Sequence, residues 1–173
     1  NPNVVDTSSG DVTAADIKCG KKAWVKGVEI TGVGWPRFKD NGNGTVTDNT
    51  TGLIWLKNAN CFGAKTWQQA MDAAAALASG QCGLTDGSAA GDWRLPQEDN
   101  GSLREWRDFV NTSYSLPALS NGCGTAKWTN GDVFDNVQSG NYWSSTAGAD
   151  GSDGAWVVSM WGGSVGYGNK SYT

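Results

Sequence analysis

Few residues of this chain could perform acid–base or nucleophilic chemistry. The 173 residues include ten Trp but no His, so carboxylates are the main groups left for proton transfer. Glu98 and Asp99 are the carboxylates nearest to a sequence motif. Adjacent residues rarely face each other across a substrate at the separation that a glycosidase requires. We therefore expect no catalytic residues, and we interpret the chain as a binding or assembly module.

Calcium binding is the second kind of chemistry that the acidic residues suggest. The run Asp40–Gly44 resembles a calcium loop, but Gly42 stands where such a loop carries Asp or Asn. A plain hairpin turn is therefore the favoured interpretation there. Asp150 and Asp153, in the Gly-rich loop 147–154, form another possible calcium site. We expect no cofactor, with calcium at these two residues as the alternative.

The composition favours an exported protein with disulfide bonds. Without His or a C-x-x-C pair, two disulfides are favoured over zinc, and three pairings are possible among Cys19, Cys61, Cys82 and Cys123. The formal net charge of −4 lacks the basic footprint that nucleic acid requires. No apolar run approaches the ~20 residues that cross a bilayer. We expect an extracellular or cell-surface location, no nucleic-acid partner and no membrane span.

The first 34 residues are expected to form a unit of their own. In Ala23–Ile30, polar and apolar residues alternate around a central Lys-Gly pair, which is typical of a short β-hairpin. A cluster of Gly and Pro at 32–36 then interrupts the pattern. We place a boundary there, which gives an N-terminal extension over 1–34 and a main domain over 35–173.

Short strands are expected at both ends of the main domain. Residues 37–57 predict strand, turn and strand, and end in a buried strand at Leu53–Leu56. The last third of the chain predicts three more strands with a two-residue turn at Gly162-Gly163, namely Asn141–Thr146, Ala155–Trp161 and Ser164–Tyr167.

Two amphipathic helices are expected between these groups of strands. Thr66 and Gln69 predict a capping box for a helix over Thr66–Ser79. Ser102 and Glu105 predict a second capping box for a helix over Ser102–Val110. Because short helices are marginal in isolation, both are expected to pack on a sheet.

The last hairpin carries the best candidates for ligand contact. Aromatic faces stack on sugar rings or apolar protein patches, and Asn and Ser adapt their hydrogen bonds. The expected ligand-binding residues are Trp161, Ser164, Tyr167, Asn169 and Tyr172. An equally weighted alternative is that they form ordinary surface or subunit packing. By contrast, Trp93, Tyr142 and Trp143 are expected in the core, with Arg94 paired to a carboxylate or to carbonyls.

Six motifs of the main domain resemble, in order and spacing, those of one bacterial family. They are Arg37–Asn49, Thr51–Trp55, Thr66–Ala70, Asp92–Pro96, Tyr142–Thr146 and Ala155–Val157. The match extends over roughly residues 37–172. The chain resembles the DUF1566 family, also called the C-terminal domain of the Legionella collagen-like protein.

The resemblance implies an α+β, C-type-lectin-like fold, with two helices flanking a small twisted antiparallel sheet and, here, an N-terminal β-hairpin extension. It implies a non-catalytic bacterial domain, extracellular or at the cell surface, that binds a glycan or protein ligand or mediates adhesion. In similar sequences the residues matching Cys61 and Cys82 often occur without other cysteines. The resemblance therefore implies the pairs Cys61–Cys82 and Cys19–Cys123, the second of which would tether the N-terminal unit.

One departure from the family pattern suggests an alternative function. Family members continue beyond Tyr172 with a further strand, whereas this sequence stops at Thr173. In lectin-like folds the last strand closes the sheet beside the first, so we expect an open edge with unpaired backbone groups. The segment Ala23–Ile30 could fill that edge within its own chain or in a neighbour. The second option predicts a homo-oligomer or an extracellular filament built by strand donation.

Overall fold

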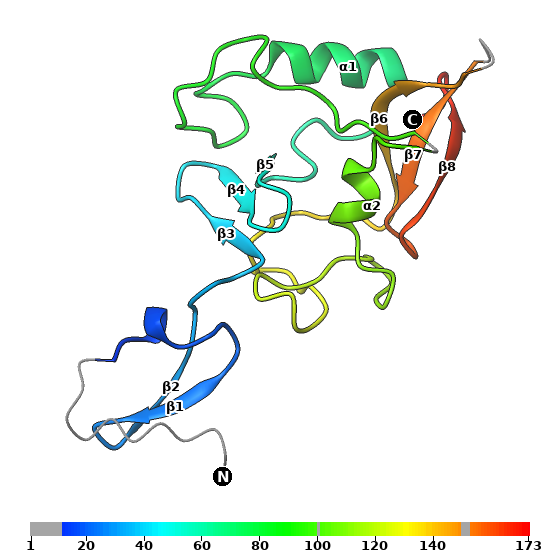
Figure 1. Ribbon diagram of the computed structural model, residues 1–173. Coiled ribbons are helices and arrows are strands. Elements are labelled where there is room, and N and C mark those ends of the chain that lie inside the picture. The colour runs from blue at the N-terminus through cyan, green and yellow to red at the C-terminus, as the bar shows by residue number, and fades with distance from the viewer. Residues whose placement is uncertain (1–11, 100, 150–152) are drawn as a thin grey trace.

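The computed structural model describes residues 12–99, 101–149 and 153–173 (Figure 1). In these residues the fold is mostly β, with three small antiparallel sheets and two short α-helices. The expected mixture of helices and strands is therefore present. The strands form three separate sheets, ordered β1-β2, β3-β4-β5 and β6-β7-β8, and not one continuous sheet.

The N-terminal unit contains the expected hairpin. Strands β1 (Lys22–Val25) and β2 (Val28–Thr31) are antiparallel and are joined by Lys26 and Gly27, whose φ angles are 50° and 80°. Positive φ at both turn positions matches the right-handed twist of the strands, which favours a Lys-Gly turn here. β1 and β2 pair with each other in a sheet of their own. Of the two options for this segment, the one in which it fills an edge of the main domain within its own chain is therefore not what the structure shows.

A disulfide ties this unit to the main domain. Figure 1 shows the hairpin standing away from the remaining elements, connected by a single chain segment. Cys19 pairs with Cys123, and their Cα atoms lie 5.4 Å apart. Gly34 contributes to the unit through its N–H, which donates to the Ile17 carbonyl at 2.9 Å. A side chain at Gly34 would collide with the Ala15 carbonyl, so the close approach of the two segments requires Gly.

The second sheet consists of β3 (Phe38–Asp40), β4 (Thr45–Asp48) and β5 (Ile54–Leu56). Its first turn is the expected hairpin turn, in which the Gly42 N–H donates to Asp40 Oδ1 at 2.9 Å. The expectation that the last strand is buried is wrong, because Ile54 is 59% exposed. β5 is an edge strand that pairs with β4 alone, and this position in the sheet explains the exposure.

Helix α1 (Trp67–Ala76) starts where the sequence predicts and ends earlier than predicted. The Thr66 N–H donates to Gln69 Oε1 at 3.1 Å, which confirms the capping box. The helix stops before Ser79 because Leu77 turns into the core with extended backbone angles. The returning loop then satisfies the helix end, since the Gly91 N–H donates to the Ala75 carbonyl at 2.8 Å.

Helix α2 (Glu105–Phe109) is shorter than predicted, and its expected capping box is wrong. Ser102 lies outside the helix, and Asp99 Oδ1 instead accepts the Leu103 N–H at 2.9 Å. The Glu105 carboxylate does not turn back to cap the helix, because it binds Arg94. The Glu105 side chain, which the local motif predicts as a cap, therefore forms a tertiary ion pair with Arg94 instead.

The third sheet consists of β6 (Asn141–Ala147), β7 (Gly154–Ser159) and β8 (Ser164–Asn169). The expected two-residue turn is wrong, because the last pair is Ser159 with Ser164 and a four-residue connection follows. Met160 is buried, and its carbonyl accepts the Ala118 N–H at 2.7 Å. This bond to a distant loop draws Met160 out of β7 and lengthens the turn.

Aromatic side chains from all parts of the main domain meet in one core. Phe109 on α2 lies 5.4 Å from Phe38 on β3 and 5.5 Å from Phe134, measured between ring centroids. Trp55 on β5 stacks on Phe109 at 4.2 Å. The Trp106 indole N–H donates to the Trp143 carbonyl at 3.1 Å, which ties α2 to β6. The second and third sheets are therefore held together by rings and indole hydrogen bonds.

Candidate functional site

A cleft of about 620 Å³ opens between β5, α1, α2 and β6. Its floor reaches the core through Trp106, Phe109 and Leu119, which are buried. The loops 58–65 and 92–96 form the remaining walls. The aromatic residues that line it outside the core floor are Trp55, Phe62, Trp93, Tyr142 and Trp143. In size and apolar character the cleft is typical of sites that bind small molecules or the side chains of a partner.

Hydrogen bonds hold the aromatic walls in fixed positions. The Trp93 indole N–H donates to Ser88 Oγ at 3.0 Å, and the Trp143 indole N–H donates to the Lys65 carbonyl at 3.0 Å. Burial raises the pKa of Tyr142, whose hydroxyl accepts the Gln138 N–H at 2.9 Å. Trp93 is only partly buried and is absent from the buried core, so the expectation that it packs in the core is wrong.

The rim of the cleft carries a two-bond ion pair. Arg94 donates from both terminal nitrogens to Glu105, and both N–O distances are 2.7 Å. The Gln97 N–H donates to Glu105 Oε2 at 2.6 Å. The hydrogen bonds from Arg94 hold the pKa of Glu105 below its usual value. The expected pairing of Arg94 with a carboxylate is confirmed, and it fastens loop 92–96 to the first residue of α2.

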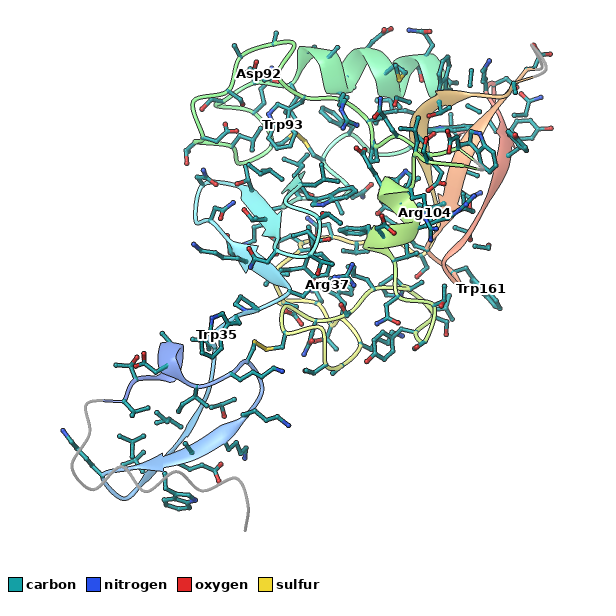
Figure 2. All side chains as sticks on the ribbon, viewed as in Figure 1. Trp35, Arg37, Asp92, Trp93, Arg104 and Trp161 are labelled. Atoms are coloured by element: carbon teal, nitrogen blue, oxygen red, sulfur yellow. A yellow bond between two sulfur atoms is a disulfide. The ribbon has the colours of Figure 1, made fainter. Side chains whose placement is uncertain are left out.

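The five residues expected to bind ligand are all exposed but do not form one surface. Trp161 lies in the turn before β8, at the lower end of the hairpin in Figure 2, and Tyr172 follows the far end of β8. Side chains alternate along a strand, so Ser164 faces away from Tyr167 and Asn169. Tyr167 stacks on Trp156 at 4.2 Å. The structure therefore groups only Tyr167 and Asn169 on one face.

The carboxylates considered for catalysis are occupied by structural contacts. Glu98 is fully buried, and its Oε1 lies 3.2 Å from Nε of Arg107. Burial raises the pKa of Glu98, and the charge of Arg107 opposes that rise. Asp99 accepts backbone N–H groups of the loop that precedes α2. Neither carboxylate lines the cleft.

Positions considered for calcium are also accounted for where the structure describes them. Asp40 Oδ2 lies 2.7 Å from Nζ of Lys57, and this hydrogen bond lowers the pKa of Asp40. An ammonium group thus already neutralises that turn. Asp150 lies outside the described residues, and Asp153 is exposed. Within the described ranges, no group of three or more acidic, Cys or His side chains could hold a metal ion.

The cleft itself was not predicted from the sequence. Two of its walls are the motifs Asp92–Pro96 and Tyr142–Trp143, which were assigned to packing. The available signal was a surplus of aromatic residues next to loops with small residues. That signal does not distinguish a ring buried in the core from a ring that borders a cleft, because the two differ only in long-range contacts.

These observations define a class of protein: a mostly β domain held by two disulfides, with an aromatic cleft between its sheets and helices. The second disulfide joins Cys61 to Cys82, so both pairs are those that the resemblance implies. Disulfides of this kind indicate an oxidising location reached by export. Across the described residues, no helix is long and apolar enough to span a membrane.

The chain belongs to the Lcl C-terminal domain family, whose profile matches residues 44–173. This match confirms the family that the six motifs predict. The family is not one known for catalysis. No curated protein and no solved structure matches the chain.

Proposed function

We propose that this domain is a non-catalytic ligand-binding or adhesion module of a bacterial cell surface or its surroundings. The observation that supports the proposal most strongly is the aromatic cleft with its fixed walls and rim. Rings held by hydrogen bonds offer a large apolar contact area and lose little side-chain entropy on binding. The cleft is therefore prepared for a ligand before the ligand arrives.

The charged groups of the cleft suit recognition better than catalysis. The carboxylates that line it are Asp92 and Glu105. Glu105 is committed to Arg94 and to the Gln97 N–H, so it is not poised to transfer a proton to a substrate. Asp92 accepts the Ala89 N–H at 2.8 Å. Both carboxylates are engaged in shaping the rim.

The final hairpin is proposed as a second, flatter contact surface. Tyr167 and Asn169 share a face, and the ring of Tyr167 is supported from below by Trp156. We also propose that the arrangement corresponds to a C-type-lectin-like fold. A glycan or a protein ligand would suit an aromatic surface of this type.

Arrays of glycans and of bacterial and host proteins test the proposal. Loss of a central aromatic anchor removes roughly 2 kcal/mol of binding free energy, which is about 30-fold in affinity. We expect Trp93→Ala to weaken the strongest array ligand by about this factor. Trp24→Ala, which changes an exposed ring of the N-terminal hairpin outside the cleft and outside the final hairpin, is the matched control. Equal binding by Trp93→Ala and the wild type, for every ligand found, would refute the cleft as the binding site.

A filament subunit is the second candidate function. One observation favours it: Trp35 is 75% exposed at the junction between the N-terminal unit and the main domain, where it lies near the disulfide (Figure 2). An exposed ring on a projecting unit can dock on a second copy in a head-to-tail arrangement, which builds filaments. Native mass measured across a concentration series separates the candidates. Extended assemblies favour the filament, and a concentration-independent monomer excludes it.

A further inference from the structure

We propose that the ligand of the cleft is an extended polypeptide strand of a partner protein, which adds to the open edge of β5. The inference rests on the proposed function, because it names the ligand class of the same cleft. Three observations support it: the outward-facing backbone groups of β5, the position of the cleft along β5, and the hydrogen bonds that the chain makes just after β5.

The register of the second sheet leaves two residues of β5 with outward-facing backbone groups. The Asp48 N–H donates to the Leu53 carbonyl, and the Lys57 N–H donates to the Gly44 carbonyl, both at 2.9 Å. In an antiparallel pair, hydrogen-bonded residues alternate with residues whose N–H and C=O groups point away. Ile54 and Leu56 are therefore the outward-facing residues. Their N–H and C=O groups have no hydrogen-bond partner among the described residues.

The cleft runs along this edge. Leu53, Ile54, Trp55 and Leu56 are consecutive, and all four line it. Successive side chains of a strand point to opposite faces of the sheet. A cavity that borders only one face would be lined by every second residue. Four consecutive lining residues therefore indicate that the edge itself, with its free backbone groups, borders the cleft.

Immediately beyond this edge, the chain forms an isolated parallel bridge between Asn58 and Asp135. The Asp135 N–H donates to the Lys57 carbonyl, and the Ala59 N–H donates to the Asp135 carbonyl, both at 2.9 Å. The pairing stops there, and the next two positions with outward-facing groups along the edge are Leu56 and Ile54. The Lys57 carbonyl turns away from β4 to accept the Asp135 N–H, so the hydrogen-bond pattern changes direction at Lys57. A strand lying in the cleft would form a ladder of its own on the same side of the chain, next to this bridge.

The outward-facing N–H and C=O groups of β5 are best matched by a polypeptide ligand. An edge strand presents N–H and C=O groups at every second residue, a repeat that an extended peptide matches with its own backbone. The aromatic walls add pockets for apolar side chains at alternate positions of that peptide. The matching ligand is therefore a strand with apolar residues at every second position.

The chain itself is a poor source of such a strand. β1 and β2 already pair with each other in their own sheet. Residues 1–12 include only Val4, Val5 and Val12 as large apolar residues, and these do not alternate. We commit the proposal to a strand of another protein, and a strand of this same protein, from its own chain or from a second copy, is an outcome that the experiment must detect.

Linear dodecapeptides selected from a phage library against the whole disulfide-bonded chain are the probes. The tightest peptide is resynthesised with a single N-methyl group at each position in turn. Methylation at every second residue along the paired stretch is expected to weaken binding at least about tenfold, because each methyl removes a donor and blocks the edge. Methylation at the intervening residues is expected to change binding less than about threefold.

A backbone variant of the protein supplies the matched test. Ile54→Pro removes an N–H that points away from β4 and leaves the β4–β5 ladder intact, since Pro is tolerated where the N–H faces outward. We expect it to weaken peptide binding at least about tenfold, with Ile54→Val as the control that keeps the N–H. Near-ultraviolet circular dichroism checks that the aromatic core is unchanged. The N-methyl scan leaves the protein untouched, so it decides the question if the Pro variant fails to fold.

Other outcomes would overturn the inference in distinguishable ways. Peptides that depend on Trp93 but tolerate N-methylation at every position bind through side chains, which overturns the strand and leaves the proposed function. If the ligands that depend on Trp93 are glycans and no cleft-dependent peptide is selected, the strand proposal is also overturned and the proposed function is left. Peptides and array ligands that bind Trp93→Ala and Ile54→Pro as tightly as the wild type overturn both proposals. Self-association that Ile54→Pro abolishes assigns the edge to a second copy and overturns the partner assignment.

Discussion

The ion pair at the rim of the cleft allows a quantitative test of how the cleft is held. Glu105→Ala removes two charge-assisted bonds of 2.7 Å from Arg94 and the bond of 2.6 Å from the Gln97 N–H. Bonds to charged groups contribute about 1.5–3 kcal/mol in total for a site like this, and solvent screening favours the lower end, because the Arg94 side chain is 50% exposed. We expect the free energy of unfolding to fall by about 2 kcal/mol.

Thermal unfolding followed by near-ultraviolet circular dichroism measures this loss. For a domain of this size, it corresponds to a decrease in Tm of about 4–8 °C. Asp108→Ala is the control, because its ion pair with Arg104 is longer, at 3.9 Å, and both side chains are at least half exposed. The control is expected to change the free energy of unfolding by less than about 0.5 kcal/mol. Equal losses in the two variants would refute the reasoning.

The same pair predicts a pH dependence of defined sign. Arg94 lowers the pKa of Glu105 in the folded state, whereas a Glu in the unfolded chain titrates near about 4.3. The stabilisation is therefore fully present above that pH and is lost as pH falls through the lower folded pKa. The difference in stability between the wild type and Glu105→Ala is expected to shrink on acidification. A difference that stays constant down to the acid transition would contradict the assignment.

Three further predictions test the scaffold. Gly168→Ala places a Cβ 3.0 Å from an indole of the cleft wall and should cost about 1–3 kcal/mol, whereas Gly166→Ala, with nothing within 4 Å, should cost under about 1 kcal/mol; urea unfolding compares them. Replacing Cys61 and Cys82 together by Ser opens a loop of 21 residues and should lower the free energy of unfolding by about 3 kcal/mol in the same assay. Burial raises the pKa of Glu98, so the wild type should gain stability relative to Glu98→Gln as pH falls from neutral, measured by thermal unfolding across pH.

The sequence correctly predicted those helices and hairpins whose ends are fixed by residues close together in the chain. The hairpin around Lys26 and Gly27 and the start of α1 at Thr66 depend on turn and capping geometry, which the sequence displays directly. The capping box at Ser102 failed because its partner, Glu105, is claimed by Arg94 eleven residues earlier. A local preference for helix capping is overridden where a tertiary contact of the same side chain is stronger.

The cleft could not be predicted from local sequence patterns, because it too depends on tertiary contacts. Its walls come from segments far apart in the chain, such as Trp55 on β5 and Trp143 on β6, and only the packed fold brings them together. From the sequence, Trp93 and Trp143 are expected in the core because an indole is large and apolar. Hydrogen bonds to Ser88 and to the Lys65 carbonyl hold both rings along the cleft. The sequence displays the rings but not those acceptors.

Residue-resolved amide hydrogen exchange along β5 tests the central claim most directly. In the free protein, the amides of Trp55 and Lys57 are expected to exchange slowly, because they face β4, and those of Ile54 and Leu56 to exchange rapidly. Saturation with a cleft-binding peptide is expected to slow the exchange of Ile54 and Leu56. Protection of these two amides in the free protein, or rapid exchange that persists when the peptide is bound, would contradict an open strand edge as the ligand site.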